Sequence, residues 1–117
     1  MIWNPEHECM NVDSLRALQF ARLKNLVERV YNTVPFYKEK LDKAGIKPSD
    51  IKCLSDISKL PFTTKTDLRD TYPYGLLAVP QSEIVEIHMS SGTTGTPVVD
   101  AYTAKDLDDW AEGMART

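Results

Sequence analysis

The sequence predicts a chain of the α+β or α/β class, with a helical region over residues 1–82 and a strand–loop–strand–helix unit over residues 83–117. Three observations lead to this prediction. Apolar residues recur at the helical period before Pro35, and apolar and polar residues alternate over residues 83–89. A run of serine, glycine and threonine then separates this segment from a second one rich in β-branched residues. With 117 residues, the chain is long enough for one small domain.

The first long helix is expected to begin at Asp13 or Ser14 and to run to about Val34. Asp and Ser are residues that cap helix N-termini, and Pro35 disfavours helical geometry at the residue before it. Along this segment the apolar side chains share one face, while the charged side chains fall largely on the other. The apolar face carries Leu23, Leu26, Val27, Val30, Tyr31 and Val34. The pattern indicates an amphipathic helix.

A second, shorter helix is predicted over residues 36–44, with Gly45 as the C′ residue in the left-handed conformation. The stretch over residues 48–60 is rich in turn residues. Within it, Ser49 and Ser55 are candidate N-caps of single-turn helices.

Another short helix is expected after Thr64, because an N-cap residue there is followed by an acid, Asp67, three residues on. This helix should end before Pro73. Irregular structure is expected over residues 74–81, where glycine and proline break regular elements.

The character of the sequence changes after residue 82. Val85, Ile87 and Met89 alternate with polar residues, which is the strand period. Residues 97–102 contain the β-branched pair Val98 and Val99 and the aromatic Tyr102, and they predict a second strand.

A helix should follow the second strand. Thr103 and Asp106 form a capping box, and Leu107, Trp110 and Met114 give the helix an apolar face. The sequence stops soon afterwards without a C-cap signal. We therefore expect a longer parent chain.

Composition argues against several classes of function. A net charge of −3 and the lack of a Lys/Arg cluster argue against nucleic-acid binding. No apolar run approaches the roughly 20 residues of a membrane helix, and the acidic N-terminus lacks the apolar core of a secretory signal. Cys9 and Cys53 stand alone, and no His/Cys cluster has metal-ligand spacing. The expectations are a cytoplasmic location, no membrane partner and no metal-binding residue in this segment.

The most informative stretch is a loop of small polar residues. Its glycines allow positive φ and close approach of the backbone to a ligand, and successive N–H groups in such a curl form an anion-binding nest. Hydroxyl groups around the same point add short hydrogen-bond donors. The predicted phosphate-binding residues are Ser90, Ser91, Gly92, Thr93, Thr94, Gly95 and Thr96.

This loop differs from the better-known nucleotide-binding motifs. A Walker A loop needs Gly-Lys-Ser/Thr after four intervening residues, and a dinucleotide fingerprint needs Gly-x-Gly-x-x-Gly; neither is present. It also joins two predicted strands, so no helix N-terminus faces the anion. The alternative interpretation is a plain hairpin turn, although seven residues exceed the two to five usual for hairpins.

The loop and its flanks resemble the phosphate-binding loop of the adenylate-forming enzyme superfamily, which includes acyl-CoA synthetases, peptide-synthetase adenylation domains and luciferases. Within that superfamily, the chain is similar to the N-terminal part of the phenylacetate–CoA ligase family. The resemblance covers nearly the whole chain. The matching stretches are Trp3-Asn4-Pro5-Glu6, Val34-Pro35-Phe36-Tyr37, Leu60-Pro61-Phe62-Thr63-Thr64-Lys65, Asp67-Leu68-Arg69 and Ile87-His88-Met89-Ser90-Ser91-Gly92-Thr93-Thr94-Gly95.

The resemblance implies a fold and an activity. The fold would be part of the large N-terminal domain of an adenylate-forming enzyme. The parent enzyme would convert ATP, with Mg²⁺, and an aryl acid such as phenylacetate into an acyl-adenylate, and would then use CoA to form the thioester. This segment would supply the loop that holds the ATP phosphates. No catalytic residue is expected within it, because the resemblance places the catalytic lysine and the remaining contacts elsewhere.

One position departs from the family pattern. The family loop commonly continues Gly-Lys-Pro, whereas this chain reads Gly95-Thr96-Pro97. The change removes one cation, so we expect weaker ATP binding with the nest retained.

Other residues have plainer interpretations. His88 is expected to be structural, Lys65 to start a helix, and Trp3 and Trp110 to be core or interface anchors. Two alternative functions stay open: a stand-alone nucleotide- or anion-binding module, and a helical interaction domain without catalysis. Unpaired strand edges also predict either self-association or pairing with the remainder of a ligase chain.

Overall fold

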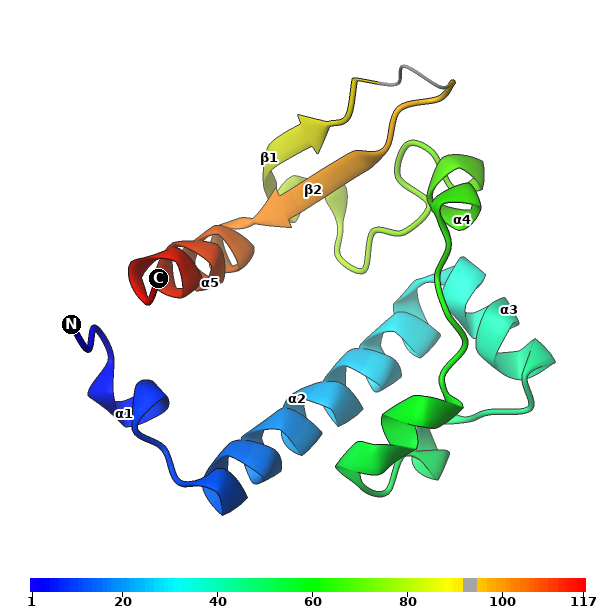
Figure 1. The fold of residues 1–117 in the computed structure, drawn as a ribbon. Coiled ribbons are helices and arrows are strands. Elements are labelled where there is room, and N and C mark those ends of the chain that lie inside the picture. The colour runs from blue at the N-terminus through cyan, green and yellow to red at the C-terminus, as the bar shows by residue number, and fades with distance from the viewer. Residues whose placement is uncertain (92–94) are drawn as a thin grey trace.

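The computed structural model describes residues 1–91 and 95–117, and Figure 1 shows how their helices and strands are arranged. Helices precede a strand pair and a final helix, as predicted, so the chain is an α+β segment. The α-helices are α1 (Pro5–Glu8), α2 (Val12–Thr33), α3 (Pro35–Lys43), α4 (Lys65–Asp70) and α5 (Ala104–Ala115). The 3-10 helices are η1 (Pro48–Asp50), η2 (Leu54–Lys59) and η3 (Gln81–Glu83), and the strands are β1 (Ile84–Met89) and β2 (Val99–Thr103).

The long helix α2 begins earlier than predicted. Its N-cap is Asn11, whose side-chain oxygen accepts a 2.9 Å hydrogen bond from the backbone N–H of Ser14. Asp13 and Ser14 lie inside the first turn, so their predicted role as caps is wrong. Asp13 still favours the helix start electrostatically, because the first turn carries the positive end of the helix dipole.

The break between α2 and α3 is the one that the sequence predicts. Val34 has extended geometry, with φ −117° and ψ 103°, as expected for a residue before proline. Pro35 then serves as the first residue of α3, a position where its missing N–H costs nothing. Gly45 has φ +70° after α3, which confirms the predicted left-handed residue. A kink at one proline therefore folds α3 back onto α2.

The 3-10 helices are capped differently from the prediction. Ser49 and Ser55 lie within η1 and η2 rather than at their N-caps. Asp50 instead accepts a 2.8 Å hydrogen bond from the N–H of Lys47, and Asp56 accepts a 3.0 Å bond from the N–H of Cys53. A carboxylate with two oxygens reaches back to the free N–H groups at the start of each turn more readily than a short hydroxyl does.

The apolar core is small and lies where α2, α3 and the following turns meet. Val27, Leu41 and Ile51 form one buried cluster, and Val34 is buried at the α2–α3 corner. Partly buried side chains surround the cluster: Phe20, Leu23, Tyr31, Ile46 and Leu60. This core confirms most of the predicted apolar face of α2. Leu26 is the exception, because 47% of it is exposed.

Much apolar surface remains open to solvent. The accessible surface is 8364 Å², whereas a compact monomer of this mass would expose about 6,400 Å². Trp3 and Trp110 are exposed, so neither is a core residue of the segment, and their alternative role as interface anchors stays a prediction. Phe62, Met89 and Met114 are exposed as well. The segment therefore buries far less of its surface than a self-sufficient domain of its size.

The two strands form an antiparallel hairpin. In its register Met89 lies opposite Val99, and Ile87 lies opposite Ala101. Val85, Ile87 and Met89 are all more than 40% exposed. The predicted strand is confirmed, with an irregularity of register between Ile84 and Glu86, and among the described residues little covers these apolar side chains.

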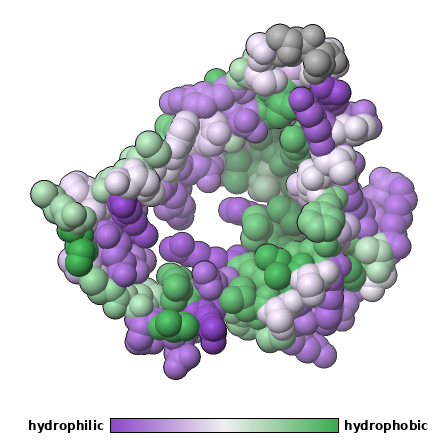
Figure 2. Space-filling view, viewed as in Figure 1, coloured by the Kyte–Doolittle hydropathy of each residue, from purple (hydrophilic) through white to green (hydrophobic). Residues whose placement is uncertain are grey.

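The chain as a whole forms an open ring. Figure 1 shows α2 along one side and the hairpin with α5 along the other, and Figure 2 shows the hollow between them. Glu112 of α5 helps to close the ring, because its carboxylate accepts hydrogen bonds from Trp3 Nε1 at 2.9 Å and from Asn4 Nδ2 at 2.7 Å. Among the described residues, no helix combines the length and apolarity needed to cross a membrane.

Replacing a core leucine tests where the stability of the segment lies. Leu41→Ala should lower the free energy of unfolding by about 2–4 kcal/mol, because it leaves a cavity among packed side chains. Urea denaturation followed by circular dichroism measures the change. The matched control is Leu26→Ala on the exposed side of α2, which should cost less than about 1 kcal/mol. Equal losses from the two variants would contradict the assignment of the core.

The closure between α1 and α5 should be sensitive to acid. Hydrogen bonds from Arg116, Asn4 and Trp3 lower the pKa of Glu112 from an ordinary value of 4.5 to about 2. A lowered folded-state pKa means that this contribution to stability is fully present above pH 4.5 and is lost as the pH falls toward 2. The indole N–H resonance of Trp3 should therefore titrate near pH 2. Glu112→Gln should abolish the transition, Asp108→Asn should leave it in place, and a midpoint near 4.5 would contradict the contact.

Candidate functional site

The predicted phosphate loop connects the two strands of the hairpin. Ser90 and Ser91 directly follow β1, and Gly95 and Thr96 lead toward β2. Gly92, Thr93 and Thr94 lie outside the described residues. The strand-to-strand setting that the sequence predicts is confirmed by the antiparallel pairing of β1 and β2.

Gly95 has the positive φ that was expected of a glycine in this loop. Its φ is +127°, a region that residues with a Cβ rarely adopt. An added Cβ would meet no atom within 4 Å, so the requirement for glycine here comes from the backbone conformation rather than from crowding. The neighbouring Ser91 and Thr96 are exposed. Their hydroxyls are thus accessible to a ligand that approaches the loop.

Ser90 pairs with Val98 at the base of the loop. The N–H of Ser90 donates to the carbonyl of Val98 at 3.0 Å. The N–H of Val98 in turn donates to the side-chain oxygen of Ser90 at 2.9 Å. Ser90 was predicted only as a phosphate ligand, and nothing in the sequence pattern marks this second role, because it depends on the register of the two strands.

Three rings pack together beside the hairpin. His88 lies 5.0 Å from the ring of Tyr102 and 5.7 Å from the ring of Trp110, measured between centroids. The imidazole Nε2 also contacts the carboxylate of Glu86. These contacts agree with the expected structural role of His88. The cluster joins β1, β2 and α5 and so helps to hold the strand that leads into the loop.

The start of α5 follows the predicted capping box. The Thr103 hydroxyl accepts a 3.2 Å bond from the N–H of Asp106, and Asp106 accepts a 2.8 Å bond from the N–H of Thr103. Hydrogen bonds from Thr103 lower the pKa of the Asp106 carboxyl, and the positive charge of Arg29 lowers it further. Arg29 belongs to α2 and Asp106 to α5, so at this point a charge on one long side of the ring acts on a carboxyl group on the other.

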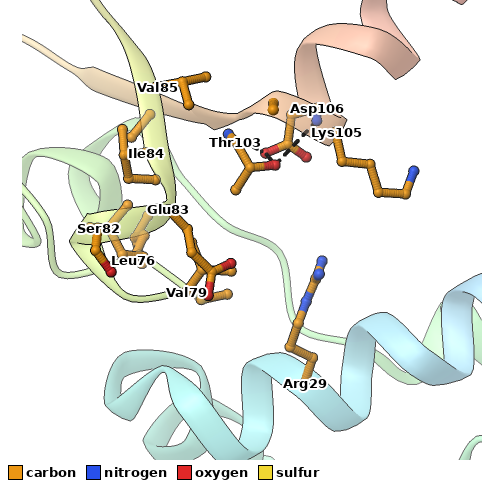
Figure 3. Close-up of a pocket in the computed structure, with 14 residues that line it drawn as sticks. Arg29, Leu76, Val79, Ser82, Glu83, Ile84, Val85, Thr103, Lys105 and Asp106 are labelled. Atoms are coloured by element: carbon orange, nitrogen blue, oxygen red, sulfur yellow. Dashed lines mark hydrogen bonds between the residues drawn. The ribbon is translucent and has the colours of Figure 1, made fainter.

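A cavity of about 610 Å³ lies near this helix start, and Figure 3 shows its lining residues. Arg29 reaches into it from α2, while Glu83 and Asp106 face it from the other side. The cations Arg29 and Lys105 are balanced by these two acids, and Lys105 also pairs with Asp109. The cavity therefore has no clear preference for an anion.

The cavity and the loop are separate features. The hairpin residues that line the cavity include Ile84, Val85 and Thr103, which lie at the end of the hairpin away from the loop. None of its lining residues belongs to the predicted phosphate-binding set. No sequence pattern predicts the cavity, because its walls come from three parts of the chain that only the tertiary fold brings together.

The remaining candidate residues have structural surroundings. Lys65 is the first residue of α4, and Thr64 and Asp67 form the predicted capping box. Cys9 and Cys53 are free and exposed. Within residues 1–91 and 95–117, no group of three His, Cys, Asp or Glu side chains is placed to hold a metal ion.

Comparison with curated proteins identifies close relatives. The chain is 52% identical over 117 residues to a phenylacetate-coenzyme A ligase of Thermus thermophilus. It is 51% identical over 110 residues to the enzyme of that name from Escherichia coli, and 48% identical over 110 residues to that from Pseudomonas putida. It covers about a quarter of the length of each relative: 26%, 25% and 25%. A scan against models of protein families gives no match.

Solved structures give a consistent result. The chain superposes on a 2-hydroxyisobutyryl-CoA ligase in complex with 2-HIB-AMP and CoA, with a TM-score of 0.87 and 33% sequence identity. The match covers 98% of this chain and 25% of the solved one. A second structure of that ligase, in the postadenylation state with 2-HIB-AMP, gives a TM-score of 0.85 at 30% identity.

Proposed function

Because the chain is homologous to a segment of the phenylacetate–CoA ligases, we propose that it forms part of an AMP-forming aryl-acid:CoA ligase and supplies the loop that holds the ATP phosphates. The observation that carries the proposal is an identity of about 50% that extends over the whole segment, the loop included. The segment spans about a quarter of its relatives, so the activity belongs to a longer polypeptide.

The described part of the loop supports the phosphate-binding role. Gly95 has positive φ, and the hydroxyls of Ser91 and Thr96 are accessible. Backbone N–H groups and hydroxyls bind phosphate oxygens without a fixed positive charge. Such a site suits a product that must leave, because the pyrophosphate is not held by a strong ion pair. Thr96, in place of the lysine common in the family, removes one further cation.

The proposed reaction has two steps. In the first, a carboxylate oxygen of the aryl acid attacks the α-phosphorus of ATP; the bond to the bridging oxygen breaks, and pyrophosphate leaves. In the second, the thiolate of CoA attacks the acyl carbonyl carbon and displaces AMP. The task of the loop in the first step is to fix the β- and γ-phosphates so that the α-phosphorus is open to in-line attack.

The co-reactants of this proposal are ATP with Mg²⁺, an aryl acid such as phenylacetate, and CoA. The structural relatives that carry 2-HIB-AMP and CoA support an adenylate intermediate and a thioester product. Mg²⁺ would arrive with ATP and use phosphate oxygens as ligands, since Mg²⁺ binds largely through substrate phosphates and water. The free, exposed Cys9 and Cys53 fit a reducing compartment, and we place the enzyme in the cytoplasm.

The loop glycines give a direct test of the proposal. The segment can be joined to the remaining three quarters of the Thermus thermophilus relative, and ATP–pyrophosphate exchange can be measured with phenylacetate. Gly92→Ala should raise the KM for ATP or lower the exchange rate by about tenfold or more, because a Cβ interferes with a nest that approaches its ligand closely.

Gly113→Ala in α5 is the matched control for this experiment. An added Cβ at that position meets no atom within 4 Å, and alanine favours a helix. Exchange in this variant should equal that of the parent chimera. Normal exchange in Gly92→Ala would remove the loop from the proposed mechanism.

We also propose that the exposed apolar surface pairs with protein, either the remainder of a ligase chain or, in its absence, a second copy. The hairpin presents Val85, Ile87 and Met89 to solvent, and a two-stranded sheet has two open edges. At micromolar concentration the 117-residue chain should therefore exceed the monomer mass of 13.2 kDa in light scattering. Ile87→Glu should lower the measured mass, whereas Ile57→Glu in η2 should change it little. A monodisperse monomer would contradict this part of the proposal.

A further inference from the structure

Ser90 occupies a special place in the hairpin. The last pair that belongs to the two strands is Met89 opposite Val99, so the next pair in register is Ser90 opposite Val98. The first hydrogen bond of that pair is regular, from the N–H of Ser90 to the carbonyl of Val98 at 3.0 Å. The ladder thus continues one residue beyond β1 on this side.

The second hydrogen bond of the pair is not regular. In an antiparallel pair of this type, each residue donates its N–H to the carbonyl of the other. Here the N–H of Val98 donates instead to the Ser90 hydroxyl oxygen, at 2.9 Å. The side chain of Ser90 thus replaces its own carbonyl as the acceptor. Ser90 and Val98 therefore stay paired, but the Ser90 carbonyl does not have to point toward Val98, so the backbone after Ser90 need not follow the direction of the strand.

This exchange fixes the two ends of the loop. Ser90 and Val98 are held at the spacing of a hydrogen-bonded pair, roughly 5.5 Å between Cα atoms. The predicted phosphate-binding residues after Ser90 lie between these two ends in the sequence. Holding the two ends at a fixed spacing reduces the conformational entropy that binding would otherwise cost, which is the benefit of preorganisation.

We propose that Ser90 is a positioning residue of the phosphate loop: its hydroxyl accepts from the Val98 N–H and so sets the base from which the loop curls. The role of Ser90 in phosphate binding rests on the proposed function, whereas its hydrogen bond with Val98 is observed in the described residues. A hydroxyl at position 90 is required, and its role is separate from any contact that the neighbouring Ser91 makes with phosphate.

Amide hydrogen exchange in the 117-residue chain, followed residue by residue by NMR, tests the hydrogen bond. Ser90→Ala should speed exchange of the Val98 amide by about tenfold, the effect of losing one hydrogen bond. Ser90→Thr keeps the hydroxyl and should restore exchange to within about twofold of the original. Ser91→Ala, a neighbouring loss of a hydroxyl, should leave the Val98 amide unchanged. The amide of Val27, in the core, verifies that each variant is folded.

The positioning role is tested by placing the same substitutions in the chimera with the Thermus thermophilus relative and measuring the KM for ATP in ATP–pyrophosphate exchange. Ser90→Ala should raise this KM by about tenfold, and Ser90→Thr should stay within about twofold of the parent chimera. Unchanged Val98 exchange in Ser90→Ala would overturn the inference. Equal weakening by Ala and Thr would do the same, since it would point to side-chain fit rather than to the hydroxyl.

The two experiments separate failure of this inference from failure of the proposed function. If the chimera exchanges pyrophosphate and neither Gly92→Ala nor Ser90→Ala alters the exchange while Val98 amide exchange still depends on the Ser90 hydroxyl, the phosphate-binding function of the loop fails and with it the positioning role. If Gly92→Ala impairs the chimera and Ser90→Ala leaves its KM for ATP unchanged, the function stands and the inference about Ser90 is wrong.

Discussion

The packing of α3 and the 3-10 turns against the C-terminal half of α2 is the contact on which the rest of the structure depends. It is built from few side chains: Val27, Leu41 and Ile51, with Val34 at the corner. The corner exists because Pro35 ends one helix and begins the next. Without that turn the apolar face of α2 would have no partner within the segment. Burial drives folding roughly in proportion to apolar area, so this small region carries most of the stabilisation.

The remainder of the segment is held by polar and aromatic contacts more than by burial. Glu112 ties the N-terminal residues to α5, and the rings of His88, Tyr102 and Trp110 tie the hairpin to the same helix. Contacts of this kind contribute modestly when they are exposed to water. An open ring with an uncovered hairpin follows from this balance. The chain spans about a quarter of the length of the curated relatives it matches, and our proposal is that protein covers the apolar surface it leaves open.

The loop is positioned by this arrangement rather than by a helix. In the familiar phosphate-binding folds, a helix N-terminus faces the anion and its dipole adds to the attraction. Here the loop joins two antiparallel strands, so its geometry depends on strand register and on the pairing of Ser90 with Val98. In the proposed phosphate site, the placement of backbone and hydroxyl donors replaces the attraction of a helix dipole. The cavity near Arg29 and Asp106 lies at the opposite end of the hairpin from the loop, where other residues surround it.

Local features were determined by the sequence itself. The helical period of α2, the proline at its end, the capping boxes at Thr64 and Thr103 and the alternation in β1 each act within a few residues, so propensity and hydrogen-bonding rules suffice to predict them. The loop motif is equally local, and it carries the resemblance to the adenylate-forming enzymes. The start of α2 at Asn11 was missed because several neighbouring residues can cap a helix, and only the backbone geometry selects one.

Only the tertiary structure decided which features act together. The exposure of Leu26, Trp3 and Trp110 depends on what packs against them, which a periodic pattern does not contain. Glu112 closes the ring through hydrogen bonds with Asn4, 108 positions away in the sequence, and with Trp3, 109 positions away. The role of Ser90 rests on one register between two strands, and a shift by one residue would remove it. Sequence determined the chemistry that the loop offers; the three-dimensional fold determined how its ends are held, because contacts between distant residues are set by the packing of the whole segment.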